Sequence, residues 1–193
     1  NQNINLDGLK MVDEATGMSV ALIGSDGIYS AVVVSGANQT IDLSEIAVPD
    51  DLTVLVLQNE INTDANFEII KKVPKSTFII LNAAPALTPN KDFFERIDLL
   101  IVNQLEAKML LNEEPSIFNI LDALRKLQNL GPKEVIITLG AEGYTGISKN
   151  GEIFSEPGIK VDVLSTHGAG DSFVGTLAAF ICKGEPINIA AQY

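Results

Sequence analysis

The residues best suited to chemistry form a glycine-rich stretch near the end of the chain. Gly168, Ala169, Gly170 and Asp171 lead directly into an apolar run. Small residues let a ligand approach the backbone closely, and the first N–H groups and the dipole of a helix starting there favour a bound anion. A carboxylate beside that anion can accept a proton from an attacking hydroxyl, as phosphoryl transfer requires. The stretch predicts an anion hole at residues 168–170 and a general base at Asp171.

On the residues alone, two simpler interpretations of this stretch stay open. Asp171 also fits the role of a helix-capping acid, and the glycines also fit a tight turn. Two other phosphate-binding motifs are excluded. The stretch is not a Walker loop, because no Gly-Lys-Ser/Thr follows it, and Phe173 stands where the dinucleotide fingerprint requires glycine.

Composition and charge narrow the class of protein. Hydrophobic residues make up 46% and charged residues 20% of the 193 residues, which predicts a packed core. With a net charge of −12, the chain lacks the dense positive face that binding a nucleic acid needs. No apolar run approaches the roughly 18 residues of a membrane span, and no signal-peptide pattern follows Asn1. The single cysteine, Cys182, fits a reducing cytoplasm, and we expect it to be buried in a helix.

The elements that must position these residues alternate between buried strands and amphipathic helices. Continuous apolar runs predict parallel strands covered on both faces, at residues 52–57, 77–81, 98–102 and 135–139. Helical patterns occupy residues 64–72, 91–96, 106–111, 117–129 and 171–183. Two hairpins are expected, one from strands 18–23 and 28–35 around Gly24-Ser25-Asp26-Gly27, the other from strands 143–148 and 152–154. The pattern predicts a single α/β domain over residues 1–193.

Residues 166–175 resemble the signature D-T-x-G-A-G-D of the ribokinase-like (pfkB-type) carbohydrate kinases. The resemblance implies a three-layer α/β/α fold with a mainly parallel central sheet. It implies that Asp171 is the catalytic base and contacts the sugar, and that the N–H groups of Gly168, Ala169 and Gly170 form the anion hole beside ATP.

The resemblance also bears on monovalent cations. Family members that use K⁺ carry an aspartate where this chain has Ser165, and His167 occupies the variable position of the signature. A K⁺ site at Ser165 and His167 is therefore expected to be weakened by the lost carboxylate. His167 has no second His or Cys nearby, so a transition-metal site is not expected.

Two further motifs resemble the nucleotide-binding segments of the family. Asn103 and Glu106 form N-x-x-E, which implies contacts with ATP and with Mg²⁺, mostly through water; on its own, Asn103 reads as a helix cap after a strand. The second motif resembles T-L-G-x-x-G, and on its own reads as an ordinary strand–turn–strand connection. The resemblance implies that it lines the ATP site, with Thr138, Leu139, Gly140, Ala141, Glu142 and Gly143.

Fewer of the family's sugar-binding segments than of its nucleotide-binding segments can be matched in this sequence. Glu60 follows an apolar strand where ribokinase-like members have a glutamate that hydrogen-bonds the sugar, and residues 81–86 resemble the supporting segment L-N-P-A-P-A. Residues 17–38 resemble part of the β-rich lid through which members often pair, so a homodimer is considered. The N-terminal G-G-x-x-x-N segment and the C-terminal segment that flanks adenine are absent, so a fragment of the domain is expected.

The leading hypothesis is an ATP-dependent kinase that transfers the γ-phosphate of MgATP to a sugar hydroxyl, with ribose as the expected sugar. Fructose, a deoxyribose, a nucleoside or a keto-deoxy sugar acid stays open as the acceptor. A non-catalytic sugar- or nucleotide-binding regulator on the same fold is a second hypothesis. A dinucleotide-dependent oxidoreductase is disfavoured by the missing fingerprint glycines.

Overall fold

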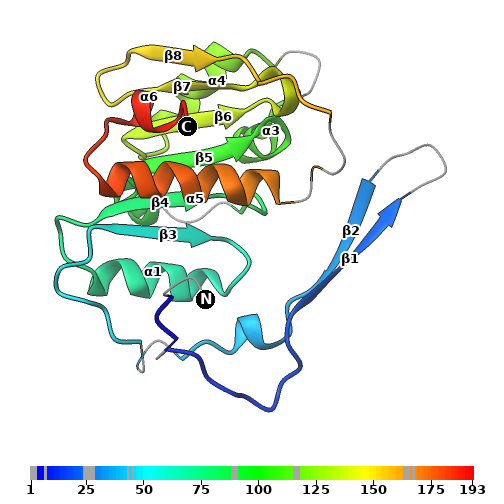
Figure 1. The fold of residues 1–193 in the computed structure, drawn as a ribbon, viewed down its shortest axis with the longest axis vertical. Coiled ribbons are helices and arrows are strands. Elements are labelled where there is room, and N and C mark those ends of the chain that lie inside the picture. The colour runs from blue at the N-terminus through cyan, green and yellow to red at the C-terminus, as the bar shows by residue number, and fades with distance from the viewer. Residues whose placement is uncertain are drawn as a thin grey trace.

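Two separate β-sheets organise the chain. The computed structural model describes residues 4–6, 8–23, 29–42, 44, 46–87, 91–114, 118–162, 166 and 168–193. The smaller sheet is an antiparallel hairpin of β1 (Met18–Ile23) and β2 (Tyr29–Val34), with Met18 opposite Val34. It projects from the main body of the molecule (Figure 1). The turn predicted at residues 24–27 lies outside the described residues.

The larger sheet has the strand order β3-β4-β5-β6-β7-β8. The first four strands are parallel, and β7 pairs antiparallel with both β6 and β8. The strands are β3 (Val54–Gln58), β4 (Phe78–Asn82), β5 (Leu99–Asn103), β6 (Glu134–Thr138), β7 (Tyr144–Ile147) and β8 (Ile153–Glu156). The predicted parallel sheet and its following hairpin are confirmed, with strand ends shifted by a residue or two.

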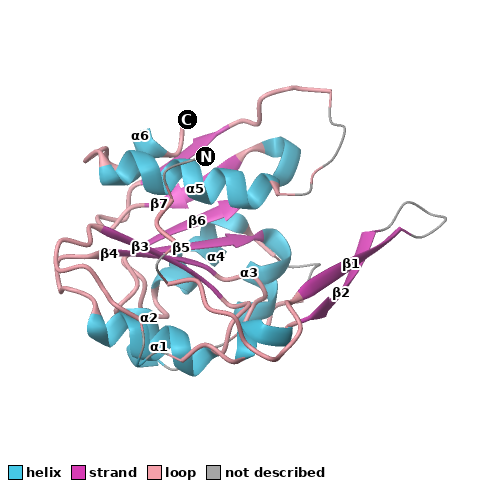
Figure 2. Ribbon diagram, turned by 60° about the horizontal axis from the view of Figure 1, so that its bottom comes forward, coloured by secondary structure: helices cyan, strands magenta, loops and turns pink. Residues whose placement is uncertain are grey.

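Helices cover both faces of the large sheet, as Figure 2 shows. One face carries α1 (Thr63–Lys72), α2 (Lys91–Glu95), α3 (Gln104–Leu111) and α4 (Ile120–Gln128), and the other carries α5 (Ala169–Cys182) and α6 (Ile187–Ala190). The expected three-layer α/β/α architecture is confirmed. Among the helices described, none is long and apolar enough to cross a membrane.

The central strands are apolar throughout because both of their faces are buried. Successive side chains of a strand point to opposite faces. On β4, Ile79 and Leu81 therefore join the core under α1–α4, whereas Ile80 joins the core under α5 and α6. All three side chains are fully buried.

The expectation that Cys182 is buried is wrong. Its side chain is exposed at the end of α5, where Sγ lies 3.5 Å from Oγ1 of Thr53. Helix α5 buries only the stripe that contains Val174 and Leu177, and helical spacing places residue 182 off that stripe.

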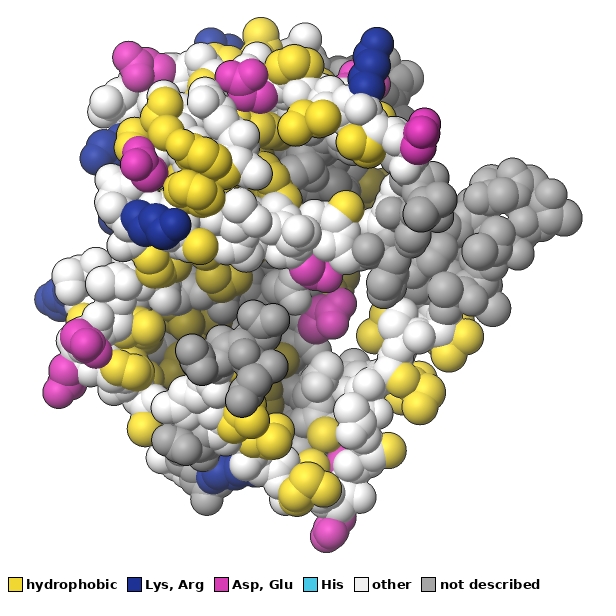
Figure 3. All heavy atoms as spheres, viewed as in Figure 1, with side chains coloured by type: hydrophobic (Ala, Val, Ile, Leu, Met, Phe, Trp, Pro, Cys, Tyr) yellow, Lys and Arg dark blue, Asp and Glu magenta, His cyan; other side chains and the backbone are white. Residues whose placement is uncertain are grey.

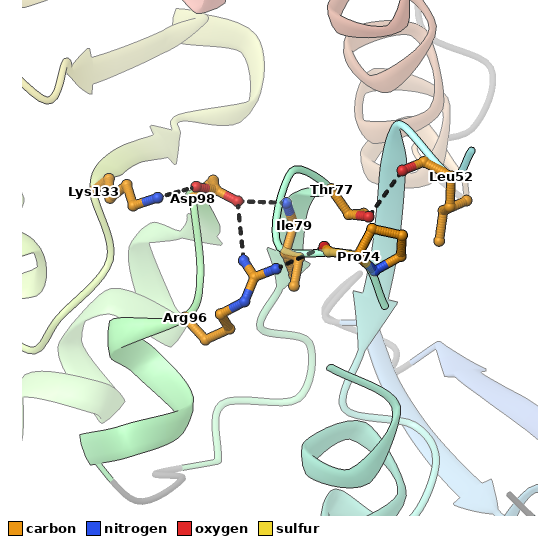
Figure 4. Close-up of polar contacts among 7 residues, drawn as sticks. All are labelled: Leu52, Pro74, Thr77, Ile79, Arg96, Asp98 and Lys133. Atoms are coloured by element: carbon orange, nitrogen blue, oxygen red, sulfur yellow. Dashed lines mark hydrogen bonds and ion pairs between the residues drawn. The ribbon is translucent and has the colours of Figure 1, made fainter. Parts of the chain in front are cut away.

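The amino-terminal edge of the sheet is joined by a buried carboxylate, shown in Figure 4. Asp98, just before β5, accepts the N–H of Ile79 at 2.8 Å and the ammonium of Lys133 at 2.5 Å, and its Oδ2 lies 3.7 Å from Arg96. Nearby, the buried hydroxyl of Thr77 donates to the carbonyl of Leu52 at 2.8 Å. These contacts tie together the starts of β3, β4, β5 and β6.

Candidate active site

The opposite, carboxyl-terminal edge of the sheet is built from polar strand ends. The last residues of the four parallel strands are Gln58, Asn82, Asn103 and Thr138. Gln58 pairs in register with Asn82, and Asn103 with Thr138, whereas Asn82 lies opposite Ile101, so the polar residues form two adjacent pairs at this edge. Ligands of open α/β sheets bind outside the carboxyl ends of the strands, which makes this edge the place to look for a site.

Helix α5 starts at this edge without a side-chain cap. Its N-cap is Gly168, which adopts a left-handed conformation with φ of 76°. The N–H of Ala169 donates to the carbonyl of Thr166 at 3.2 Å and that of Ser172 to Gly168 at 2.9 Å. Within the part of the chain that the structure describes, the N–H of Gly170 has no acceptor. Of the three predicted amides of the anion hole, that of Ala169 is thus engaged, whereas those of Gly168 and Gly170 donate to no backbone carbonyl among the described residues.

Open space lies in front of this first turn. A Cβ atom added to Gly168 or Gly170 would meet nothing within 4 Å. The two glycines therefore do not serve close packing within the described protein. Glycine at position 168 is explained by its positive φ, whereas Gly170 leaves free a space that a ligand can fill.

Asp171 is the third residue of α5 and does not cap it, which removes the simpler interpretation of this acid. Its Oδ1 accepts a hydrogen bond of 3.1 Å from Nε2 of Gln58, at the end of β3. The carboxylate therefore lies toward β3 rather than toward the helix's own first N–H groups. In Figure 3, acidic side chains gather in the hollow between the start of α5 and the β1–β2 hairpin.

A cleft of about 810 Å³ lies on the other side of the same helical turn. The predicted residues Thr138, Gly140, Gly143, Ala169 and Gly170 line it. Its other walls come from the segment after β8, from α5, and from the last residues of the chain: Tyr144, Glu156, Pro157, Gly158, Ile159, Val161, Ser172, Phe173, Thr176, Leu177, Ala190, Ala191, Gln192 and Tyr193. None of these lining residues is Lys or Arg, so the positive potential that they offer an anion comes from backbone N–H groups and the dipole of α5.

The other residues predicted beside ATP do not line this cleft. Leu139 packs against the core on the opposite face of the sheet. Ala141 and Glu142 belong to a short 3-10 helix, Gly140–Glu142, and Asn103 lies on the neighbouring strand β5. A contact between any of these and a nucleotide remains a prediction.

The two glycines of the turn after β6 differ in what they do. Gly140 has φ of 61°, and an added Cβ would meet open space. Gly143 has φ of 97°, and an added Cβ would lie 2.0 Å from the carbonyl oxygen of Glu156. Gly158 is equally tight, with its hypothetical Cβ 2.2 Å from the carbonyl oxygen of Ala141. Two backbone segments thus meet here without side chains between them.

Tyr144 contributes a buried polar atom beside the cleft. Its hydroxyl has no hydrogen-bond partner among the described residues. Burial raises the pKa of this phenol, and the charge of Glu156 raises it further. The ring packs against Phe154 and Phe173, with centroids 6.3 and 5.6 Å away, so this wall is largely aromatic.

Asn103 and Glu106 form a capping box at the start of α3. Oδ1 of Asn103 accepts the N–H of Glu106 at 2.8 Å, and Oε2 of Glu106 accepts the N–H of Asn103 at 2.7 Å. Burial raises the pKa of Glu106, and the bond from Asn103 opposes that rise. A carboxylate has more acceptor sites than this one bond uses. The pair therefore fits Mg²⁺ held through water; within the described residues, no cluster of three His, Cys, Asp or Glu side chains offers a direct site.

The loop after β3 is anchored on both sides, which fixes the backbone that leads to Glu60. Buried Asn59 donates its N–H to the carbonyl of Ala84 at 3.1 Å and its Nδ2 to the carbonyl of Pro85 at 2.9 Å. Nδ2 of Asn66, on α1, donates to the carbonyl of Gln58 at 2.7 Å. The segment after β4 thus supports this loop, as the sequence suggests. Glu60 is exposed two residues after Gln58, and its role toward a sugar remains a prediction.

Sequence reasoning missed Gln58 and the aromatic wall, and part of the predicted cation site cannot be placed. The position of Gln58 as the last residue of an apolar strand, two residues before Glu60, is the signal that could have found it. Tyr144 and Phe173 carry no motif or spacing that separates them from ordinary core aromatic residues. Ser165 and His167 lie outside the described residues.

The fold and site define a three-layer α/β protein with a ligand cleft at the carboxyl edge of its parallel strands, beside a glycine-rich helix start. The chain belongs to the pfkB family of carbohydrate kinases, whose family model matches residues 1–193.

Relatives agree with this assignment. The ribokinase of Schizosaccharomyces pombe is 29% identical over 201 residues, which cover 98% of this chain and 63% of that protein. The crystal structure of Thermotoga maritima ribokinase has a TM-score of 0.80 at 28% identity, covering 93% of this chain and 61% of that one. Arabidopsis thaliana ribokinase complexed with ribose and ATP has a TM-score of 0.77 at 28% identity, covering 93% and 60%. The chain thus spans about three fifths of the length of these relatives.

Proposed function

We propose that this chain carries the catalytic core of an ATP-dependent sugar kinase. One observation carries the proposal: the first turn of α5 has the large cleft on one side and the carboxylate of Asp171 on the other. Gly170 lines the large cleft, whereas Asp171, the next residue, is hydrogen-bonded toward β3. A nucleotide on one side and an acceptor hydroxyl on the other would meet at this turn.

The residues of the turn supply what phosphoryl transfer requires. ATP would occupy the cleft with its terminal phosphate in the open space before Gly170, where the N–H and the helix dipole stabilise negative charge. Asp171 would take the proton of the sugar hydroxyl as its oxygen bonds to the γ-phosphorus. The bond from that phosphorus to the bridging oxygen breaks, and ADP leaves. The protein supplies position and charge, and forms no covalent intermediate.

Mg²⁺ would accompany ATP and neutralise charge on its phosphates. Asn103 and Glu106 would hold the waters of that ion, because their oxygens already cap α3 and the carboxylate keeps acceptor capacity. The K⁺ prediction at Ser165 and His167 is tested by assaying turnover with and without K⁺.

Ribose is the acceptor that we propose first. The relatives named above are ribokinases, and one of them was solved with ribose and ATP. Glu60 would accept a hydrogen bond from the sugar, since it follows the loop whose Gln58 contacts Asp171. An ADP-release screen over ribose, deoxyribose, fructose, nucleosides and keto-deoxy sugar acids decides among acceptors.

We also propose a homodimer formed through the hairpin. Met18 and Val20 pair in register with Val34 and Val32, and all four side chains are exposed. Burying such an apolar face against a second copy would stabilise the pair. Light scattering of the full-length protein measures its mass and tests this.

Asp171→Asn in the full-length protein tests the function. Loss of the base should lower kcat by roughly 10²- to 10⁴-fold, with ATP binding and thermal stability little changed. Asp122→Asn is the matched control, because Asp122 is also a first-turn acid, on helix α4 against the opposite face of the sheet. Near-normal turnover by Asp171→Asn would refute the base. A wild-type protein that is stabilised by ATP but releases no ADP with any sugar would instead be a binding regulator.

A further inference from the structure

The hydrogen bond between Gln58 and Asp171 connects the central sheet to the helix that carries the proposed base. Nε2 of Gln58 donates to Oδ1 of Asp171 at 3.1 Å, across 113 positions of sequence. Gln58 ends β3, and α5 lies across the same region of the sheet in Figure 1. The contact joins the end of a strand to the first turn of α5, so it bears on how the carboxylate of Asp171 is held.

The backbone of Gln58 is itself held in place. Gln58 pairs with Asn82 on β4. Its carbonyl accepts the 2.7 Å bond from Nδ2 of Asn66, which is 1% exposed on the opposite face of the sheet. The next residue, Asn59, is hydrogen-bonded to the segment after β4. The amide donor thus extends from a rigid support rather than from a free loop.

The chemistry of this donor suits the orientation of a base. The amide engages one carboxylate oxygen, Oδ1, and leaves Oδ2 for an acceptor hydroxyl. A neutral amide fixes the rotation of the carboxylate without the full positive charge that a Lys or Arg would add. It also carries no proton that could be lost to the base at neutral pH.

We propose that Gln58 is a positioning residue, which holds the carboxylate of Asp171 so that Oδ2 faces the sugar hydroxyl. The proposal rests on the proposed function. It assigns Gln58 no contact with ATP and no proton transfer of its own. Its effect should therefore appear in kcat and pass entirely through Asp171.

The first test is Gln58→Met in the full-length protein. Methionine keeps the length of the side chain and removes the donor. We expect kcat to fall roughly 10- to 100-fold, because small misplacements of catalytic groups have effects of that size. The KM for ATP and the thermal midpoint should stay near wild type. Gln128→Met is the matched control, since the amide of Gln128 donates to the carbonyls of Lys133 and Ser148, away from the site.

The second test is a double-mutant cycle with Asp171→Asn. If Gln58 acts through Asp171, adding Gln58→Met to Asp171→Asn should lower kcat no further. A wild-type kcat for Gln58→Met, an additive loss in the double variant, or a loss confined to the KM for sugar would each overturn the positioning role. Normal turnover of Asp171→Asn alone would instead overturn the proposed function, so the two failures are distinguishable.

Discussion

The two edges of the central sheet use polar groups in opposite ways. At the amino edge, Asp98 and Thr77 are buried, and their polar atoms bond to backbone or to charged partners. At the carboxyl edge, Asp171 and Glu60 are exposed, and Gly170 faces an open cleft. Buried polar groups must be satisfied by the protein, whereas an edge built for ligands leaves some of its groups to be satisfied by them. The comparison predicts that mutations at the first edge change stability and mutations at the second change function.

Asp98→Ala should produce the largest change in stability. It removes the acceptor of the Ile79 N–H and the partner of Lys133 and Arg96. The free energy of unfolding should fall by roughly 2–4 kcal/mol, measured by urea denaturation. Turnover per folded molecule should not change, because the site lies at the other edge.

Asp98→Asn is the control for this prediction, because an amide oxygen can still accept the Ile79 N–H. It should recover part of the lost stability. An Asp98→Ala protein with normal stability and lost turnover would break the comparison between the edges.

Gly170→Ala should separate folding from binding at the carboxyl edge. Alanine favours a helix over glycine by up to about 1 kcal/mol, so the fold should not weaken. The new methyl group would occupy the open space before the first turn, and overpacking there should weaken ATP binding by roughly 10-fold. Calorimetric titration with ATP measures this.

Gly175→Ala provides the matched comparison. Gly175 lies in the same helix, an added Cβ there also meets nothing within 4 Å, and it does not line the cleft. It should gain helix stability and bind ATP normally. Equal ATP affinity in both variants would show that the phosphates do not approach Gly170.

Glu106→Gln should have the smallest effect on stability. The folded-state pKa of Glu106 is raised above its ordinary value of 4.5 by burial, so the folded protein holds a proton more readily than the unfolded chain. Its contribution to stability therefore falls as pH rises from 4.5 through the raised value. Glutamine keeps the capping box and removes this dependence.

At neutral pH, the variant should be more stable by less than about 1 kcal/mol, since water screens a half-buried carboxyl group. Urea unfolding between pH 4 and 7 checks the slope. A requirement for more Mg²⁺ in the assay would support the role of Glu106 toward the metal's waters. An unchanged Mg²⁺ requirement would leave Glu106 as a helix cap alone.

The sequence predicts the layers well because burial dictates them. Ile79, Ile80 and Leu81 are apolar in succession since both faces of β4 are covered, and such runs separated by helices indicate a parallel sheet. The sequence pattern predicts that α5 starts at Asp171, two residues late, because small residues such as Ala169 and Gly170 do not extend the apolar helical pattern. Because the helix starts earlier, Asp171 lies within its first turn and is not its N-cap.

Contacts between segments that are distant in the sequence could not be predicted from the sequence pattern. Nothing in a single chain relates Gln58 to Asp171, because their pairing depends on how α5 crosses the sheet. The different roles of Gly140 and Gly143 are equally hidden, since the segment that contacts Gly143 begins with the residues around Glu156. Local spacing proposes candidate residues, and tertiary packing decides which of them meet.

The close approach of Gly143 and Gly158 to opposing carbonyl groups has a consequence for adaptation. Part of the cleft wall is shaped by main-chain atoms, so substitution of Gly143 or Gly158 would disturb folding before it altered which ligand the cleft accepts. If the cleft holds the phosphate donor, as we propose, the choice of donor can change more readily through residues that present side chains to the cleft, such as Phe173, Thr176 and Gln192. The lining of the cleft thus divides into glycines that the fold requires and side chains that can vary.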